Sequence, residues 1–88
     1  MRVTETLHLV ASGDMGMSLT DAYDCNAWLI ESEDGLILFD TGAGRDVTAI
    51  ILEMSRAGLD PSDLKHIFLT HAHADHSGGV VPLLQGFA

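Results

Sequence analysis

The sequence of 88 residues has few basic side chains: four Lys and Arg stand against thirteen Asp and Glu, and the formal net charge is −9. A nucleic-acid-binding surface needs a stripe of Lys and Arg that neutralises phosphates, and this chain has too few to build one. The composition therefore argues against nucleic acid as a partner. The surplus carboxylates can instead offset the charge of bound divalent cations.

Long hydrophobic runs and cysteine pairs are also missing. No apolar stretch approaches the roughly 20 residues that a membrane-spanning helix needs, and residues 1–8 alternate instead of forming the apolar segment of a secretory signal. The single Cys25 cannot form an internal disulfide and has no CxxC or CxxH neighbour, so we interpret it as a small buried hydrophobe at a strand start. We expect a cytoplasmic protein with no membrane partner.

The remaining composition, 47% hydrophobic and 19% charged, is typical of a globular chain, and the length allows one small domain over residues 1–88. Asp34-Gly35 between two apolar runs predicts a hairpin, and apolar residues at helical spacing from Val47 to Ala57 predict an amphipathic helix. The full set of predicted elements is strands at 2–10, 25–32, 36–39 and 67–69, a loop or a β-hairpin tip at 11–24, a helix at 46–57, a turn or single helical turn at 60–63 and a helix starting at 80–84. This order predicts an α/β fold with helices on at least one face of the sheet.

The chemistry concentrates in the run His71-Ala72-His73-Ala74-Asp75-His76, which follows the last predicted strand and precedes Gly78-Gly79. In an extended chain His71 and His73 share a face and can bind one cation. Asp75 and His76 can face a second cation after the chain turns. Two metal ions about 3.5–4 Å apart can share a hydroxide and stabilise both oxygens of a hydrolytic reaction.

The other polar candidates have less specific patterns. His8 and His66 stand alone, so we interpret them as ordinary core or surface residues. Asp40 leaves a strand, and two interpretations stay open: a turn residue, or, with Thr41, a group that orients a metal ligand through a hydrogen bond. Met15 and Met17, in the turn-rich loop, could pack over a site.

On these residues the sequence resembles the metallo-β-lactamase superfamily, whose signature Thr-His-x-His-x-Asp-His is matched throughout by residues 70–76. The likeness extends to residues 26–30, 38–42 and 77–79. It implies the first half of a metallo-β-lactamase-type αββα sandwich, that is, a mixed β-sheet with flanking helices. The family's second half supplies a third histidine, a bridging aspartate and a last histidine, none of which falls within residues 1–88.

The resemblance also implies roles for the motif. His71 and His73 would bind the first metal ion, and Asp75 and His76 the second, with a bridging hydroxide attacking a carbonyl or phosphoester. Asp75 would in addition orient that hydroxide or accept its proton. Two divalent ions are expected, with zinc favoured by the mixed imidazole and carboxylate ligands and iron or manganese permitted.

Within the superfamily, the resemblance at His76 fits glyoxalase II-like thioesterases, lactonases, a minority class of lactamases and the nucleic-acid-processing nucleases. Because the acidity of the chain argues against the nucleases, we favour the glyoxalase II-like or lactonase-like branches and a small-molecule substrate. We expect the N-terminal half of such a hydrolase, inactive alone. The alternative is a non-catalytic metal-binding or assembly module that needs a partner chain or self-association, because half a sandwich leaves apolar faces exposed.

Overall fold

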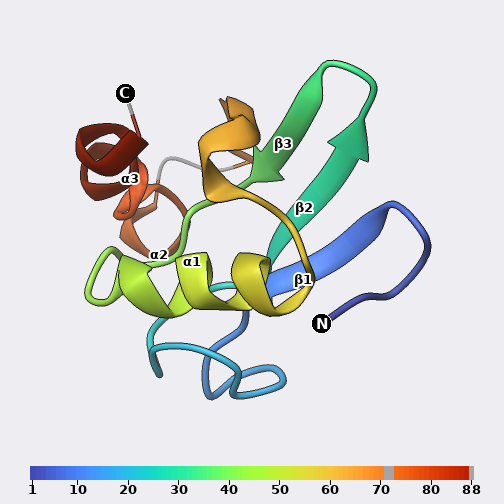
Figure 1. Ribbon diagram of the computed structural model, residues 1–88. Helices are drawn as coiled ribbons and strands as arrows, with labels where there is room; N and C mark the ends of the chain where they lie inside the picture. Colours follow the sequence, from blue (N-terminus) through green and yellow to red (C-terminus); the bar gives the residue numbers. More distant parts are fainter. Residues whose placement is uncertain (71–72, 88) are drawn as a thin grey trace.

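The computed structural model describes residues 1–70 and 73–87, which form one four-stranded sheet with helices beside it (Figure 1). The strands are β1 (Leu7–Ala11), β2 (Ala27–Ser32), β3 (Gly35–Phe39) and β4 (Leu64–Phe68). The helices are α1 (Val47–Arg56), the short 3-10 helix η1 (Pro61–Asp63), α2 (Ala74–Ser77) and α3 (Val80–Phe87). The predicted α/β class is confirmed. Within the described ranges no helix is long and apolar enough to cross a membrane.

The sheet has the strand order β1-β2-β3-β4, in which β4 alone runs parallel to its neighbour. The predicted hairpin is confirmed: Ser32 pairs with Gly35 across a two-residue turn, and Gly35 takes φ +130°, a conformation that favours glycine. Parallel strands need a crossover, and α1 lies within the one that joins β3 to β4. The carboxyl ends of β3 and β4 therefore lie side by side.

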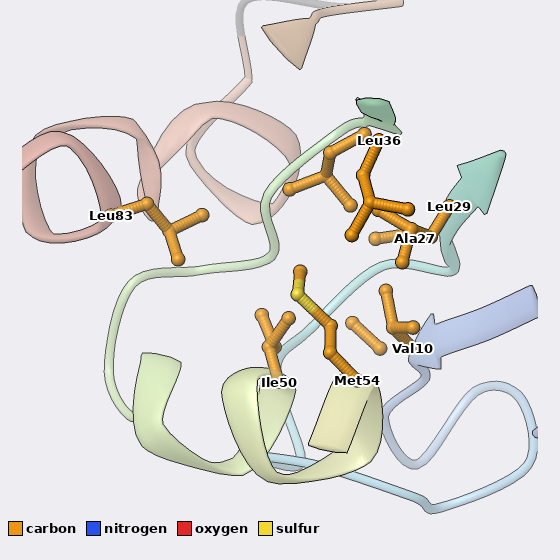
Figure 2. Packing of buried hydrophobic residues seen from close by; sticks show 9 residues of the cluster. Val10, Ala27, Leu29, Leu36, Ile50, Met54 and Leu83 are labelled. Atoms are coloured by element: carbon orange, nitrogen blue, oxygen red, sulfur yellow. The ribbon is translucent and has the colours of Figure 1, made fainter. Parts of the chain in front are cut away.

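Helix α1 covers one face of the sheet with the apolar stripe that its sequence predicts. Ile50 and Met54 are each 1% exposed and belong to the same cluster as Val10, Leu29 and Leu38 from three neighbouring strands. Figure 2 shows the two helix side chains directed at the strand residues, with Leu83 of α3 beyond them. Fully burying one such side chain stabilises a fold by about 1.5–3 kcal/mol, so this cluster is the main source of stability.

The opposite face of the sheet is also apolar but is incompletely covered. The residues that alternate with the core positions are half-buried: Trp28, Ile30, Ile37 and Phe39. Phe68 of β4 stacks on Phe39 at a ring distance of 5.6 Å and is still 52% exposed. A strand is present where one was predicted at 67–69, but its predicted bounds and burial are wrong. β4 spans 64–68 and lies at the edge of the sheet, with Leu69 exposed beyond it.

The N-terminal part is more irregular than predicted. The strand expected at 2–10 is shortened to β1, and Arg2 folds back in an isolated bridge to His8. His8 is fully buried and pairs with Glu31 at 2.8 Å, whereas His66 is exposed on β4. Both fit their interpretation as ordinary structural residues. Residues 12–26 form the predicted loop of turns.

Candidate metal centre

The site lies where β3 and β4 end. The loop of residues 40–44 leaves β3 and the segment from Thr70 leaves β4, and the two exits are joined because the Asp40 amide donates to the Phe68 carbonyl at 2.8 Å. Polar groups commonly gather at the carboxyl ends of parallel strands, where loops can approach one another. The parallel pairing thus brings together two segments that are 30 residues apart in sequence.

Asp40 is the central acceptor of this junction. It is 4% exposed, and its φ of +66° is an uncommon value for a residue other than glycine. Its carboxylate accepts from the Thr70 amide at 2.8 Å and the Thr70 hydroxyl at 2.7 Å, and it lies 3.0 Å from Nδ1 of His76. Of the two interpretations left open for Asp40, the geometry supports the one in which it orients His76.

These contacts also set the charge of Asp40. Burial by itself would raise the pKa of the carboxyl, but the hydrogen bonds from the Thr70 hydroxyl and amide and from His76 outweigh it, so the pKa lies below its ordinary value of 3.8. The carboxylate is therefore charged across the neutral range.

We expect an acid-dependent loss of stability that traces to Asp40. A carboxyl with a lowered pKa in the folded state stabilises the fold above its ordinary pKa, and this contribution disappears as pH falls through the lower folded value. In urea titrations from pH 6 downward, the stability difference between the wild type and Asp40→Asn should be constant above about pH 4 and shrink below it. A difference that grows on acidification would contradict the assignment.

Thr41, the next residue, holds the backbone of the motif. Its amide and its hydroxyl both donate to the His76 carbonyl, at 2.7 and 2.8 Å, and the hydroxyl accepts from the Gly79 amide at 3.0 Å. Gly79 has no space for a side chain, because an added Cβ would meet the Thr41 backbone. Thr41 therefore fixes α2 and the turn after it against the end of β3. Both Asp40 and Thr41 contact His76, and their role in orienting a metal ligand stays a prediction.

Asp75 and His76 lie on the short helix α2, which the sequence did not predict. Since Nδ1 of His76 is held by Asp40, Nε2 is the atom that faces Oδ2 of Asp75, at 3.6 Å. Zinc binds imidazole nitrogen and carboxylate oxygen at about 2.0–2.2 Å, so two atoms at this separation can share one ion. A carboxylate on the far nitrogen is the usual support of a metal-binding histidine. These residues therefore fit a divalent cation.

The other two predicted ligands are less defined. His73 is exposed at the start of α2, where its carbonyl accepts from the His76 and Ser77 amides. His71 lies outside the described residues. The pairing of His71 with His73 on a first metal ion therefore stays a prediction.

Cys25 approaches the site from the loop before β2. It was predicted to be a small buried hydrophobe at a strand start, but it is half-buried, two residues before β2, and its sulfur lies in a group with Asp40 and His76 whose ligand atoms are all within 4.8 Å of one another. Burial raises the pKa of the thiol to about 11, against a hydrogen bond from the Gly42 backbone, and the carboxylates of Asp40, Asp75 and Asp24 raise it further. The sulfur is therefore a neutral thiol at neutral pH.

We expect Cys25 to resist alkylation in the metal-free chain. A pKa of about 11 instead of 9.0 makes the thiolate fraction at pH 7 about a hundredfold smaller, and the thiolate is the reactive form. Iodoacetamide labelling, followed by mass spectrometry, should be slow in the folded chain and fast in urea. Equal rates in both states would contradict the raised pKa.

A cavity of about 340 Å³ opens beside Asp75, between α2 and the loop of residues 12–26. Its lining includes Met15, Tyr23, Asp24 and Asn26. Met15 and Met17 were predicted to pack over a site, but Met15 borders this cavity with its side chain fully exposed, and Met17 is exposed and is not part of the lining. The position of Asp24 and Cys25 beside the site cannot be predicted from sequence, because no local pattern relates this loop to a motif about 50 residues later.

Comparison with known proteins agrees with the geometry. Residues 20–88 match the family described as the Metallo-beta-lactamase superfamily. Ribonuclease Z of Pyrococcus abyssi is 34% identical over 79 residues, which cover 90% of this chain and 24% of that protein. The lactamase-like protein adaB of Aspergillus niger is 35% identical over 86 residues, which cover 94% of this chain and 25% of that protein. The chain thus spans about a quarter of the length of these curated relatives.

Solved structures give the same result for the fold. The metallo-beta-lactamase GOB-18 from Elizabethkingia meningoseptica superposes with a TM-score of 0.79 at 26% identity, over 99% of this chain and 28% of that one. The native FEZ-1 metallo-beta-lactamase from Legionella gormanii superposes with a TM-score of 0.78 at 26% identity, over 97% of this chain and 29% of that one. The predicted fold, part of a metallo-β-lactamase-type sandwich, is confirmed.

Proposed function

Because the chain belongs to the metallo-beta-lactamase superfamily, we propose that residues 1–88 supply metal ligands, and the groups that hold them, to a metal-dependent hydrolase acting on an ester, thioester or lactone. The observation that carries this proposal is the Asp40–His76–Asp75 arrangement, in which the buried Asp40 carboxylate lies 3.0 Å from Nδ1 of the imidazole and the Asp75 carboxylate lies 3.6 Å from Nε2. Metal-binding histidines usually have a carboxylate, backbone carbonyl or water on the other ring nitrogen, and Asp40 occupies that position here.

The proposed roles follow from position in the motif. His71 and His73 bind one ion, Asp75 and His76 bind another, and zinc is the proposed metal for both. A bound divalent cation lowers the pKa of a coordinated water to about 7 and polarises the carbonyl of a substrate. Asp75, with its side chain exposed beside the 340 Å³ cavity, orients the attacking water or accepts its proton.

A carbonyl substrate is supported by the charge of the chain. Relatives include proteins named ribonuclease Z and atrochrysone carboxyl ACP thioesterase, so the family name alone leaves the substrate class open. A net charge of −9 repels a polyanion, and the only cation near the cavity, among the described residues, is Arg45, which lies over the Tyr23 ring and 3.7 Å from Asp21. A small neutral ester, thioester or lactone suits this surface better than RNA.

The single cysteine suits the cytoplasm, where we propose that the protein acts.

The hydrolase is tested in the full natural chain that contains residues 1–88, reconstituted with zinc and assayed on thioesters, lactones and a short RNA. We expect zinc-dependent hydrolysis of a carbonyl substrate that is lost in His71→Ala and kept in His66→Ala, a matched change of an exposed histidine outside the motif. Full turnover in His71→Ala would overturn the proposed mechanism. Cleavage of RNA alone would overturn the substrate class.

A second candidate, a non-catalytic module that binds metal and assembles with another chain, is favoured by the uncovered apolar surface. Phe68 and Leu69 are 52% and 45% exposed, and a groove of about 270 Å³ between β4 and α3 is lined largely by aliphatic side chains. Exposed apolar patches of this kind mark contact surfaces. Light scattering during size-exclusion chromatography decides this point, because a well-folded monomer of residues 1–88 would count against a module that needs a partner.

A further inference from the structure

Asp24 is a buried carboxylate that the metal ligands do not explain. It is 6% exposed and lies in the loop before β2. Its Oδ1 accepts from the Ala43 amide at 2.8 Å, whereas its Oδ2 is buried and has no hydrogen-bond partner among residues 1–70 and 73–87. A buried polar oxygen that lacks a partner is costly to the fold, so Asp24 is an unusual residue to find at this position.

The loop of residues 40–44 is shaped to receive this carboxylate. Gly42 takes φ +72°, and a Cβ at this position would lie 2.5 Å from Oδ1 of Asp24. Only glycine therefore lets the loop pass close enough for the neighbouring Ala43 amide to reach Oδ1.

The same loop carries the groups that hold the proposed ligand His76. Asp40 lies against its ring and Thr41 binds its carbonyl, while on the other side of Asp24 the Cys25 amide donates to the Asp75 carbonyl at 3.3 Å. Asp24 thus lies where the loop before β2, the loop after β3 and helix α2 meet. Among the described residues, Asp24 makes no hydrogen bond to Asp75 or His76. It adjoins the loop of residues 40–44, which holds His76, and Cys25, whose amide binds the Asp75 carbonyl.

We propose that Asp24 is a positioning residue for the metal centre: through Ala43 it fixes the loop of residues 40–44 and so sets the ring and the backbone of His76. This deepens the proposed function and rests on it for the metal-binding consequence. The effect on the loop itself does not depend on a bound ion.

Three variants separate the hydrogen bond of Asp24 from its charge. Asp24→Ala removes the acceptor of the Ala43 amide, whereas Asp24→Asn keeps an acceptor and removes the carboxylate. Asp14→Ala is the control, because it removes an exposed carboxylate from the same loop. Zinc affinity is measured by competition with a chromogenic chelator. We expect Asp24→Ala to weaken binding by about tenfold or more, as outer groups of metal sites do, with Asp24→Asn and Asp14→Ala close to wild type. Equal losses in Asp24→Ala and Asp24→Asn would overturn the proposal, as would wild-type affinity in Asp24→Ala.

Hydrogen exchange in the metal-free chain gives a second readout. Asp24→Ala should speed exchange of the Thr41 and Gly79 amides, while the ladder amides of Leu29 and Leu38 keep wild-type rates. If Asp24→Ala does not fold, Gly42→Ala blocks the same contact with Asp24 in place, and the same pattern is expected. If the exchange rates of the Thr41 and Gly79 amides are the same in Asp24→Ala as in the wild type, the proposal is overturned, even when zinc binds. If the wild type does not bind zinc but Asp24→Ala still speeds exchange of these two amides, only the proposed function is overturned.

Discussion

Replacing His76 with alanine is expected to lower the zinc affinity of the chain by about a hundredfold or more. Changes in groups that merely support a ligand already cost about 10–100-fold, and His76 supplies the ligand atom itself. Its Nε2 lies 3.6 Å from Oδ2 of Asp75, so alanine leaves the carboxylate as the only donor of this pair. The measurement is competition for zinc against a chromogenic chelator at pH 7, with metal content after dialysis determined by elemental analysis.

The control is His66→Ala. His66 is an exposed histidine on β4, outside the motif, so its loss should leave zinc affinity within experimental error of wild type. Circular dichroism of both variants without metal shows whether the fold is kept. Wild-type zinc affinity in a folded His76→Ala protein would mean that Asp75 and His76 do not share an ion.

Replacing Leu38 with alanine is expected to destabilise the fold by about 3 kcal/mol. Leu38 is fully buried on β3, between β2 and β4, and packs in the cluster that includes Ile50 and Met54 of α1. Truncating a buried leucine costs about 2–5 kcal/mol, since the lost burial is followed by an unfilled cavity. A chain of 88 residues has a typical unfolding free energy of about 4–13 kcal/mol, so this one change removes a large part of it.

The loss is measured by urea denaturation of the metal-free chain. Leu52→Ala on α1 is the matched control, because that leucine is 48% exposed and its truncation should change the unfolding free energy by less than about 1 kcal/mol. Similar losses in the two variants would indicate that α1 does not pack on the sheet as described.

The sequence predicts best those parts of the fold that local chemistry determines. Asp34-Gly35 specifies the hairpin and the apolar spacing from Val47 specifies α1, because both depend on residues within a few positions of one another. The motif from His71 to His76 can also be recognised from the sequence, because few structural reasons would place three histidines and an aspartate after a strand.

The remaining features depend on residues far apart in the chain. Sequence alone leaves two interpretations of Asp40, and only the parallel pairing of β3 with β4 shows that it meets Thr70 and His76. The burial of Phe68 was overestimated because an apolar strand has the same pattern in the middle of a sheet and at its edge. Asp24 and Cys25 give no local signal at all.

The parallel pairing has a consequence for the order in which the protein folds. β1, β2 and β3 can associate through neighbouring segments, whereas β4 reaches β3 only after the chain between Phe39 and Leu64 has closed on itself. Thr41 meets His76 across 35 residues, so the contacts that hold His76 form only after this long closure. A cation held by Asp75 and His76, as proposed above, would meet its positioned ligands late and would act mainly by slowing the reopening of a sheet that has already formed.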